Sequence, residues 1–119
     1  ELLDACNGRM TVFAGYYPWE SYLAGAEGYS SVMSNIAPAL SAQTFVETVD
    51  GDAARGRALY LQSLPLINAL AGDLYVSATK AAMRMIGRPM GDPRPPRLPL
   101  PAGPEERLRA ILRDLKLLD

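Results

Sequence analysis

The sequence contains only two short stretches that resemble β-strands, with a helical stretch between them. Met10–Ala14 and Tyr29–Met33 are rich in apolar and β-forming residues, and the first is a continuous apolar run that predicts a strand buried on both faces. Residues 18–26 between them show helical spacing, with a proline in the first turn. This order predicts a βαβ unit with two parallel, adjacent strands. Two such strands leave unpaired edges, so the unit requires more sheet than this chain supplies.

After Asn35 the sequence predicts helices. Apolar residues recur at helical spacing in residues 38–49, 54–70, 76–86 and 108–118. Pro89–Pro104 holds seven of the ten prolines, which predicts an extended segment that wraps a surface. The first of these helices carries an apolar stripe of Ala39, Leu40, Ala42, Phe45, Val46 and Val49. In the second, one predicted face consists of Ala54, Ala58, Leu61, Leu64 and later Ile67 and Leu70.

Composition excludes several kinds of site. The chain has no histidine and a single cysteine, so its residues cannot form a Ser-His or Cys-His pair, a His-ligated zinc site or an internal disulfide. A net charge of −1 gives no global reason to expect nucleic acid or an anionic membrane as partner. No run reaches the roughly 18 apolar residues of a membrane span, and the start lacks the basic residues of a signal peptide. We therefore expect a soluble, cytoplasmic protein.

Charge is uneven along the chain. Residues 1–79 hold 3 basic and 8 acidic side chains, whereas residues 80–119 hold 9 basic and 5 acidic ones. A basic C-terminal part can be a docking face for an acidic partner or RNA, or it can consist of solvated helix faces whose charges are matched within the fold. The arginines lack interleaved aromatic residues, which favours the second interpretation.

Several motifs occur in the order found in one enzyme family. Phe13-Ala-Gly15-Tyr-Tyr, followed by Gly25-Ala-Glu-Gly28-Tyr-Ser-Ser31-Val-Met-Ser-Asn35-Ile-Ala-Pro38, resembles strands seven and eight of the dihydrodipicolinate synthase / N-acetylneuraminate lyase family. In that family a glycine ends strand seven, and G-x-x-G leads into a small-residue strand that finishes in Asn. The later helices and the Arg94–Leu100 stretch are similar to the family's closing segments. The resemblance covers nearly the whole chain and about the last two-fifths of the family's enzyme.

The resemblance implies a fold and an activity. The fold would be α/β, the C-terminal part of a TIM (β/α)8 barrel (strands 7 and 8) followed by a helical C-terminal extension. Residues 1–36 would form the last βαβ unit, and residues 37–119 the final barrel helix and the extension. The family condenses or cleaves 2-oxo acids, usually pyruvate, held as a Schiff base on a strand-six lysine, with a strand-five tyrosine relaying protons. Both positions would precede residue 1, so no catalytic residue is expected in this chain, and the full-length enzyme would be a homotetramer.

Gly15 and Ser30 are the candidate substrate-binding residues. Gly15 ends a predicted barrel strand on the face where such barrels bind substrate, and by resemblance it lines the pocket near the oxo acid. An interpretation of equal weight is that Gly15 only forms the turn between the strand and the following helix. Ser30 matches the family position whose backbone carbonyl faces the Schiff base, where many members have an aliphatic residue. Ser31 is either a neighbouring site residue or a small packing residue.

Other chemistry-bearing residues have structural explanations. Tyr16 and Tyr17 replace acidic or sugar-contacting residues of several family members, and they either contact a longer substrate tail or pack with Trp19 over the barrel mouth. Lys80 could form a Schiff base but is expected on a helix outside the barrel, offering charge to a carboxylate or a helix end. The remaining candidates are expected to be structural: Asp50, Asp52 and Asp73 as helix caps, and Cys6 as a plain thiol.

The functional alternatives follow from these observations. The preferred reading is a family relative acting on a sugar-acid-like or other 2-oxo acid, because the Asn-Pro segment common in dihydrodipicolinate synthases is here Gly72-Asp-Leu-Tyr-Val-Ser-Ala-Thr. The alternative is dihydrodipicolinate synthase proper, of lysine biosynthesis. A second alternative is a non-enzymatic helical module that binds a partner helix. The resemblance implies no cofactor, because the lysine imine itself serves as the electron sink, and no metal-ligand spacing occurs in the sequence.

Overall fold

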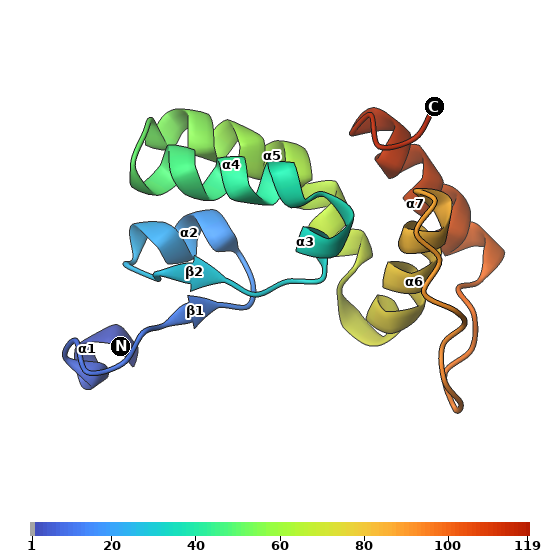
Figure 1. The fold of residues 1–119 in the computed structure, drawn as a ribbon, viewed down its shortest axis with the longest axis horizontal. Coiled ribbons are helices and arrows are strands. Elements are labelled where there is room, and N and C mark those ends of the chain that lie inside the picture. Colours follow the sequence, from blue (N-terminus) through green and yellow to red (C-terminus); the bar gives the residue numbers. More distant parts are fainter. Residues whose placement is uncertain (1) are drawn as a thin grey trace.

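Helices dominate the computed structural model, which describes residues 2–119 (Figure 1). The longest extent of the molecule is 45 Å and the shortest is 20 Å, and α1 and α7 lie toward opposite ends of the long axis. In chain order the elements are α1 Leu2–Cys6, β1 Phe13–Ala14, α2 Pro18–Leu23, β2 Gly28–Tyr29, α3 Met33–Ile36, α4 Pro38–Val49, α5 Ala53–Ala69, a 3-10 turn at Gly72–Leu74, α6 Tyr75–Met85 and α7 Ala102–Asp114.

The two strands form a parallel pair, as the βαβ pattern predicted. Phe13 is opposite Gly28 in the register. Two further hydrogen bonds extend the pairing, from Glu27 N to Val12 O at 2.9 Å and from Ser30 N to Ala14 O at 2.8 Å. Within residues 2–119 the sheet has only these two strands, so the outer edge of each is unpaired (Figure 1).

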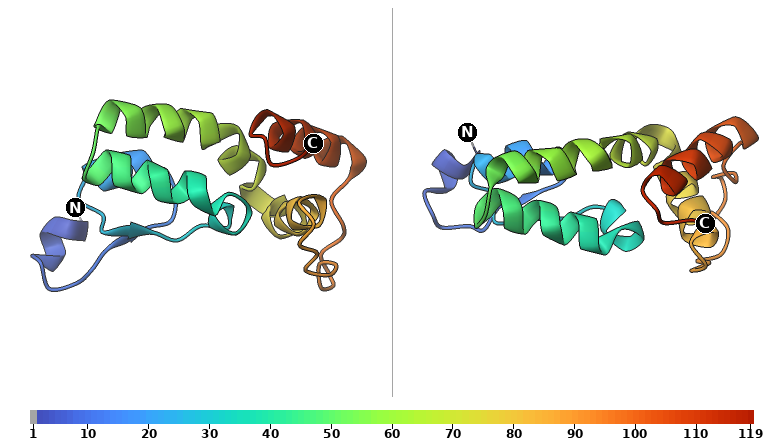
Figure 2. Two further views of the ribbon diagram at one scale, coloured as in Figure 1. Left: turned by 45° about the horizontal axis from the view of Figure 1, so that its top comes forward. Right: turned by 90° about the horizontal axis from the view of Figure 1, so that it is seen from above.

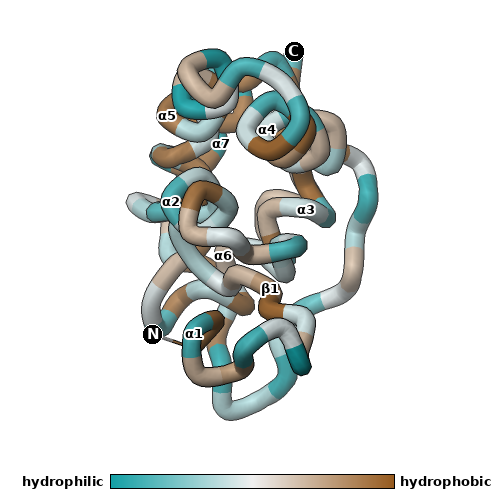
Figure 3. Tube along the Cα trace, turned by 90° about the vertical axis from the view of Figure 1, so that its left-hand side faces the viewer, coloured by the Kyte–Doolittle hydropathy of each residue, from teal (hydrophilic) through white to brown (hydrophobic). Residues whose placement is uncertain are grey.

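Both strands are shorter than the sequence predicted. The expected strand Met10–Ala14 is limited to its last two residues, and the Phe13 side chain is 62% exposed, so burial on both faces is wrong for this chain. Apolar residues do occur at β1 (Figure 3), but Met10, in the same predicted strand, is 64% exposed as well. The expected strand Tyr29–Met33 ends at its first residue. The chain turns there because Ser31 Oγ accepts a hydrogen bond from Met33 N, and α3 begins at Met33.

The antiparallel helices α4 and α5 lie side by side in all views (Figure 2). The predicted faces are wrong in part, because Val46 is 52% exposed, Val49 49% and Leu61 44%. The C-terminal end of the α5 face is confirmed, because Ile67 and Leu70 are buried. The buried residues of α4 are instead Thr44 and Thr48. Their hydroxyls donate to the carbonyl oxygens of the residues four positions earlier, so they are buried with their hydrogen bonds satisfied.

Small residues explain why this polar face is buried. The backbone of α5 approaches α4 closely at Gly56, where a Cβ atom would lie 2.9 Å from the backbone nitrogen of Thr48. A close approach of this kind selects small side chains, which a hydropathy pattern does not rank as core residues. The larger side chains that α5 buries, Tyr60, Leu66 and Ile67, lie further along the helix.

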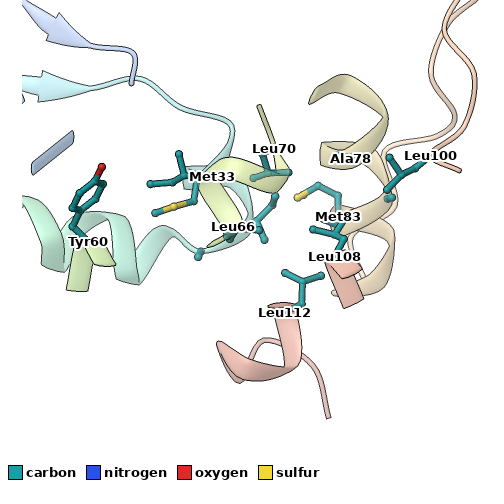
Figure 4. Packing of buried hydrophobic residues seen from close by; sticks show 14 residues of the cluster. Met33, Tyr60, Leu66, Leu70, Ala78, Met83, Leu100, Leu108 and Leu112 are labelled. Atoms are coloured by element: carbon teal, nitrogen blue, oxygen red, sulfur yellow. The ribbon is translucent and has the colours of Figure 1, made fainter. Parts of the chain in front are cut away.

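The main core lies where α3, α5, α6 and α7 meet (Figure 4). Leu66 and Leu112 are 0% exposed, and Met33 is 2% exposed. A smaller cluster joins β1 and α2 to α4, where the rings of Tyr22 and Phe45 meet edge to face at 5.0 Å. The two clusters fix the strand pair against the long helices, and so they hold the strand ends beside the C-terminal part of α5.

The proline-rich segment wraps α6, as predicted, and contains no strand. Ser77 Oγ donates a hydrogen bond to Leu98 O at 2.7 Å, and Leu100 is 8% exposed within the core. In the C-terminal part, Arg84 pairs with Glu105 at 3.0 Å, so some of its basic charge is matched within the fold. Among the described residues, no helix combines the length and apolar character that crossing a bilayer requires.

Candidate functional site

Gly15 and Ser30 come together at one edge of the sheet. Gly15 directly follows β1, and Ser30 directly follows β2. Because the strands are parallel, their carboxyl ends lie at the same edge, and the hydrogen bond from Ser30 N to Ala14 O holds the two ends side by side. The sequence therefore located correctly the edge where both candidates lie, although it overestimated the strand lengths.

A cavity of about 170 Å³ occupies this edge of the sheet. Strand ends form one wall, and the C-terminal part of α5 together with the start of α6 forms the other. The strand-end cavity, as we call it, is lined by Gly15, Tyr16, Tyr29, Ser30, Ser31, Val32, Ile67, Leu70 and Tyr75.

The backbone at Gly15 does not require a glycine. Its φ does not lie in the left-handed region, whereas that of Gly25 is +96°. A Cβ atom at Gly15 would meet no described atom within 4 Å. A methyl group here would therefore project into open space, so neither turn geometry nor packing within residues 2–119 accounts for this glycine.

Tyr29 supplies a protonated phenol to the cavity wall. Burial raises the pKa of Tyr29 above 10, a hydrogen bond with Ser31 partly opposes this, and nearby Tyr16 raises it further. The phenol thus keeps its proton at neutral pH and can donate a hydrogen bond. Its ring is held by an edge-to-face contact with Tyr22, with centroids 6.4 Å apart.

Sequence reasoning missed Tyr75 as a site residue. It begins α6 directly after the 3-10 turn, and it is 44% exposed. Gly72, at φ +71°, starts the turn that brings the chain back toward the strands. An exposed tyrosine at a helix start was the available signal, but only the tertiary fold places it beside Ser30, because 44 residues of sequence separate the two.

The predicted aromatic group of Tyr16, Tyr17 and Trp19 is divided between two places. Tyr16 lines the strand-end cavity, and its ring lies 6.3 Å from that of Tyr17, which is outside the lining. Trp19 packs instead toward α5: its Nε1 donates to Ala53 O at 3.1 Å, and its ring stacks on Tyr60 at 6.5 Å. Trp19 is therefore a packing residue, and Tyr16 is the member of the group that faces the cavity.

Lys80 lies away from the strand-end cavity. Its Nζ donates to Met90 O at 2.7 Å, so its partner is a backbone carbonyl of the proline-rich segment and not the predicted carboxylate or helix end. It borders a second cavity, of about 280 Å³, between α3, α6 and that segment. The amine thus serves to hold the wrapping segment on α6.

The remaining candidates have structural positions. Asp52 caps α5 by accepting a hydrogen bond from Ala54 N at 2.9 Å, as predicted. Cys6 Sγ lies 3.9 Å from Met10 Sδ and makes no disulfide. Within residues 2–119, no group of three or more Cys, Asp or Glu residues is arranged to hold a metal ion.

Known proteins resemble this chain in sequence and in structure. The Dihydrodipicolinate synthetase family model matches residues 1–115. A 4-hydroxy-tetrahydrodipicolinate synthase of Thermomicrobium roseum is 38% identical over 114 residues, which cover 94% of this chain and 38% of the relative.

Two solved structures superpose on most of the chain. A putative dihydrodipicolinate synthetase from Pseudomonas aeruginosa matches with a TM-score of 0.88 and 30% identity, over 96% of this chain and 40% of that one. The chloride-inhibited dihydrodipicolinate synthase from Acinetobacter baumannii, solved with pyruvate, matches with a TM-score of 0.86 and 31% identity, over 98% and 41%.

The matches agree on family and fold. The chain spans about two-fifths of the length of the relatives it matches. Its fold is that of a segment of these TIM-barrel enzymes. On the family match over residues 1–115 and these superpositions, the chain belongs to the dihydrodipicolinate synthetase family.

Proposed function

We propose that this chain is the C-terminal part of a Schiff-base-forming (class I) lyase or aldolase that acts on pyruvate or a related 2-oxo acid. In this proposal β1 and β2 are strands 7 and 8 of the barrel. Residues 1–36 form its last βαβ unit, and residues 37–119 form the final barrel helix and the C-terminal helical extension. The full-length enzyme is a homotetramer.

The observation that carries the proposal is the meeting of Gly15 and Ser30 on one cavity at the carboxyl ends of a parallel strand pair. TIM barrels bind their substrates at this end of the strands. The open space at Gly15 supports close approach of a substrate to the backbone. The relative solved with pyruvate supports a 2-oxo acid as that substrate.

The chemistry assigns this chain to the wall of the site. The amine of a lysine attacks the C2 carbonyl of pyruvate, water leaves, and the resulting imine accepts the electron pair when a neighbouring bond breaks. Neither Lys80 nor Lys116 lines the strand-end cavity. The proposal therefore places the catalytic lysine before residue 1, and the resemblance to the family places the proton-relaying tyrosine there as well.

Dihydrodipicolinate synthase proper is the second candidate. It is supported by the relatives named 4-hydroxy-tetrahydrodipicolinate synthase, which cover nearly all of this chain. The two candidates share the pyruvate imine and differ in the aldehyde that reacts with it. Steady-state rates with pyruvate and a panel of aldehydes distinguish them.

Borohydride trapping tests the proposal. The polypeptide is isolated from its source, its intact mass is measured, and it is treated with pyruvate and sodium borohydride, with borohydride alone as control. We expect a mass well above 12.9 kDa and a pyruvate-dependent adduct on a lysine outside residues 1–119. An adduct on Lys80 contradicts the assignment of roles. A complete polypeptide of 12.9 kDa without an adduct supports the helical interaction module instead.

A variant of Gly15 tests its role in the full-length enzyme. Gly15→Ala adds a methyl group to the cavity without a clash, so we expect the melting temperature to be unchanged and KM for pyruvate to rise about tenfold. Gly103→Ala, on α7 and outside the cavity, is the matched control and should leave KM unchanged. An unchanged KM in Gly15→Ala would contradict a role for this glycine in the approach of the substrate.

A further inference from the structure

The part of the strand-end cavity formed by this chain is neutral. Its polar lining side chains, within the described residues, are hydroxyl groups of tyrosine and serine, and its apolar ones come from Val32, Ile67 and Leu70. None of these side chains is a carboxylate, an amine or a guanidinium. Burial keeps the pKa of Tyr29 above its ordinary value, so this phenol also remains uncharged at neutral pH.

Tyr75 stands at the boundary between this neutral cavity and a cavity that contains an amine. It lines the strand-end cavity of about 170 Å³, and it also lines the second cavity of about 280 Å³, which Lys80 borders. The Lys80 amine already donates to Met90 O at 2.7 Å. Tyr75 and Val32 line both cavities, so these two residues lie between the Ser30 side and Lys80, which is the only basic group of the second cavity's described lining.

A neutral wall discriminates between substrate tails. A carboxylate placed against hydroxyl groups and aliphatic side chains loses its hydration without gaining a charged partner, which is costly. A hydroxyl group on the tail can instead exchange hydrogen bonds with Ser30, Tyr16 or Tyr75, because each of these side chains both donates and accepts. The wall thus favours tails that are uncharged and carry hydroxyl groups.

We propose that Tyr75 is a specificity-determining residue that, with Ser30 and Tyr16, favours a second substrate with an uncharged, hydroxyl-bearing tail over one with a carboxylate tail. This inference rests on the proposed function, because it requires that the strand-end cavity be part of the 2-oxo acid site. It assigns a substrate contact to α6, in the C-terminal extension, in addition to the contacts from the two strands.

Competing aldehydes test the inference in the full-length enzyme. Rates are measured with pyruvate and either glyceraldehyde, whose tail is neutral and hydroxylated, or succinic semialdehyde, whose tail ends in a carboxylate. We expect kcat/KM to favour glyceraldehyde by at least about tenfold. Tyr75→Phe removes one hydroxyl group and should lower kcat/KM for glyceraldehyde by about tenfold. It should change the value for succinic semialdehyde by less than about twofold, because the neutral wall already binds that tail poorly.

Two further variants exclude a purely structural effect. Tyr17→Phe alters an exposed phenol outside the cavity and should change neither rate. Tyr75→Arg places a cation at the wall and should raise the relative rate with succinic semialdehyde, a gain that a merely destabilised protein cannot show. Equal losses for both aldehydes in Tyr75→Phe, or a wild-type preference for the carboxylate tail, would overturn the inference.

Borohydride trapping separates this inference from the proposed function. The pyruvate adduct forms before the aldehyde reacts, so it should form in the wild type and in the Tyr17→Phe control whether or not the two aldehydes are distinguished. An adduct without aldehyde selectivity contradicts the role of Tyr75 alone. The absence of an adduct in the wild type contradicts the proposed function, and the inference with it.

Discussion

Two buried tyrosines connect α2, α4 and α5. Tyr22 is 7% exposed, and burial, followed by the nearby Tyr29, raises its pKa from 10.0 to about 12. Tyr60 is 4% exposed beneath Trp19, and its pKa also rises to about 12, through burial first and then through the carboxylate of Glu20. In both cases the folded state favours the neutral phenol over the phenolate.

These shifts predict a loss of stability at alkaline pH. Because the folded pKa is higher than the unfolded one, the contribution of each phenol is fully present below pH 10 and is lost as the pH rises from 10 to about 12. The loss is roughly 1–3 kcal/mol per tyrosine. Absorbance of tyrosinate at 295 nm should show a component near pH 12 that shrinks in Tyr22→Phe and in Tyr60→Phe. If neither substitution changes that component, burial does not raise the pKa of Tyr22 or Tyr60, and the prediction is wrong.

At the scale of elements, a proline and a capping residue in the sequence predicted where α4 and α5 begin, but apolar spacing did not predict which faces these two helices bury against each other. Pro38 begins α4 and the Asp52 cap precedes α5, as expected. The buried faces were misassigned because the contact between α4 and α5 is made by Thr44, Thr48 and Gly56, which are polar or small. Hydropathy patterns detect burial through large apolar side chains, so a close contact between small residues leaves no pattern.

Gly56→Ala tests this helix contact. The added Cβ atom would lie 2.9 Å from Thr48 N, so the helices must separate, and we expect the free energy of unfolding to fall by about 1–3 kcal/mol. Gly103→Ala in α7 is the control, because its Cβ atom would meet only the end of the Arg107 side chain at 3.8 Å. The control should gain up to about 1 kcal/mol from helix propensity. Urea denaturation measures both, and equal effects would contradict the close approach of the helices.

At the scale of the molecule, the helices of this chain bury the main hydrophobic core, whereas the two-stranded sheet is left with unpaired edges among the described residues. Leu66, Leu108 and Leu112 are enclosed by α5, α6 and α7 (Figure 4). Among residues 2–119, the sheet has two residues per strand, unpaired outer edges and an exposed Phe13. Such a pair is not stable by itself and depends on neighbouring strands.

Hydrogen exchange is expected to show this difference. In the 119-residue chain, amides in residues 10–31 should exchange faster than those in residues 58–70, because local opening of the strand pair exposes few buried contacts. In a full-length barrel, exchange in residues 10–31 should slow by at least about tenfold, whereas residues 58–70 should change little. Peptide-level mass spectrometry makes the comparison. Equal protection of residues 10–31 in both proteins would show that the strands need no further sheet.

The sequence by itself determined the strand–helix–strand order with its parallel pair, the four helices α4 to α7, and the edge where Gly15 and Ser30 meet, but not α3. These features depend on local signals, such as apolar spacing, prolines, caps and glycines, which act within a few residues. The tertiary structure decided which helix faces are buried, where Lys80 finds its partner, and that Tyr75 closes the cavity beside Ser30. Contacts between segments far apart in the chain depend on how closely backbones pack, and side-chain size and shape at each contact set that distance.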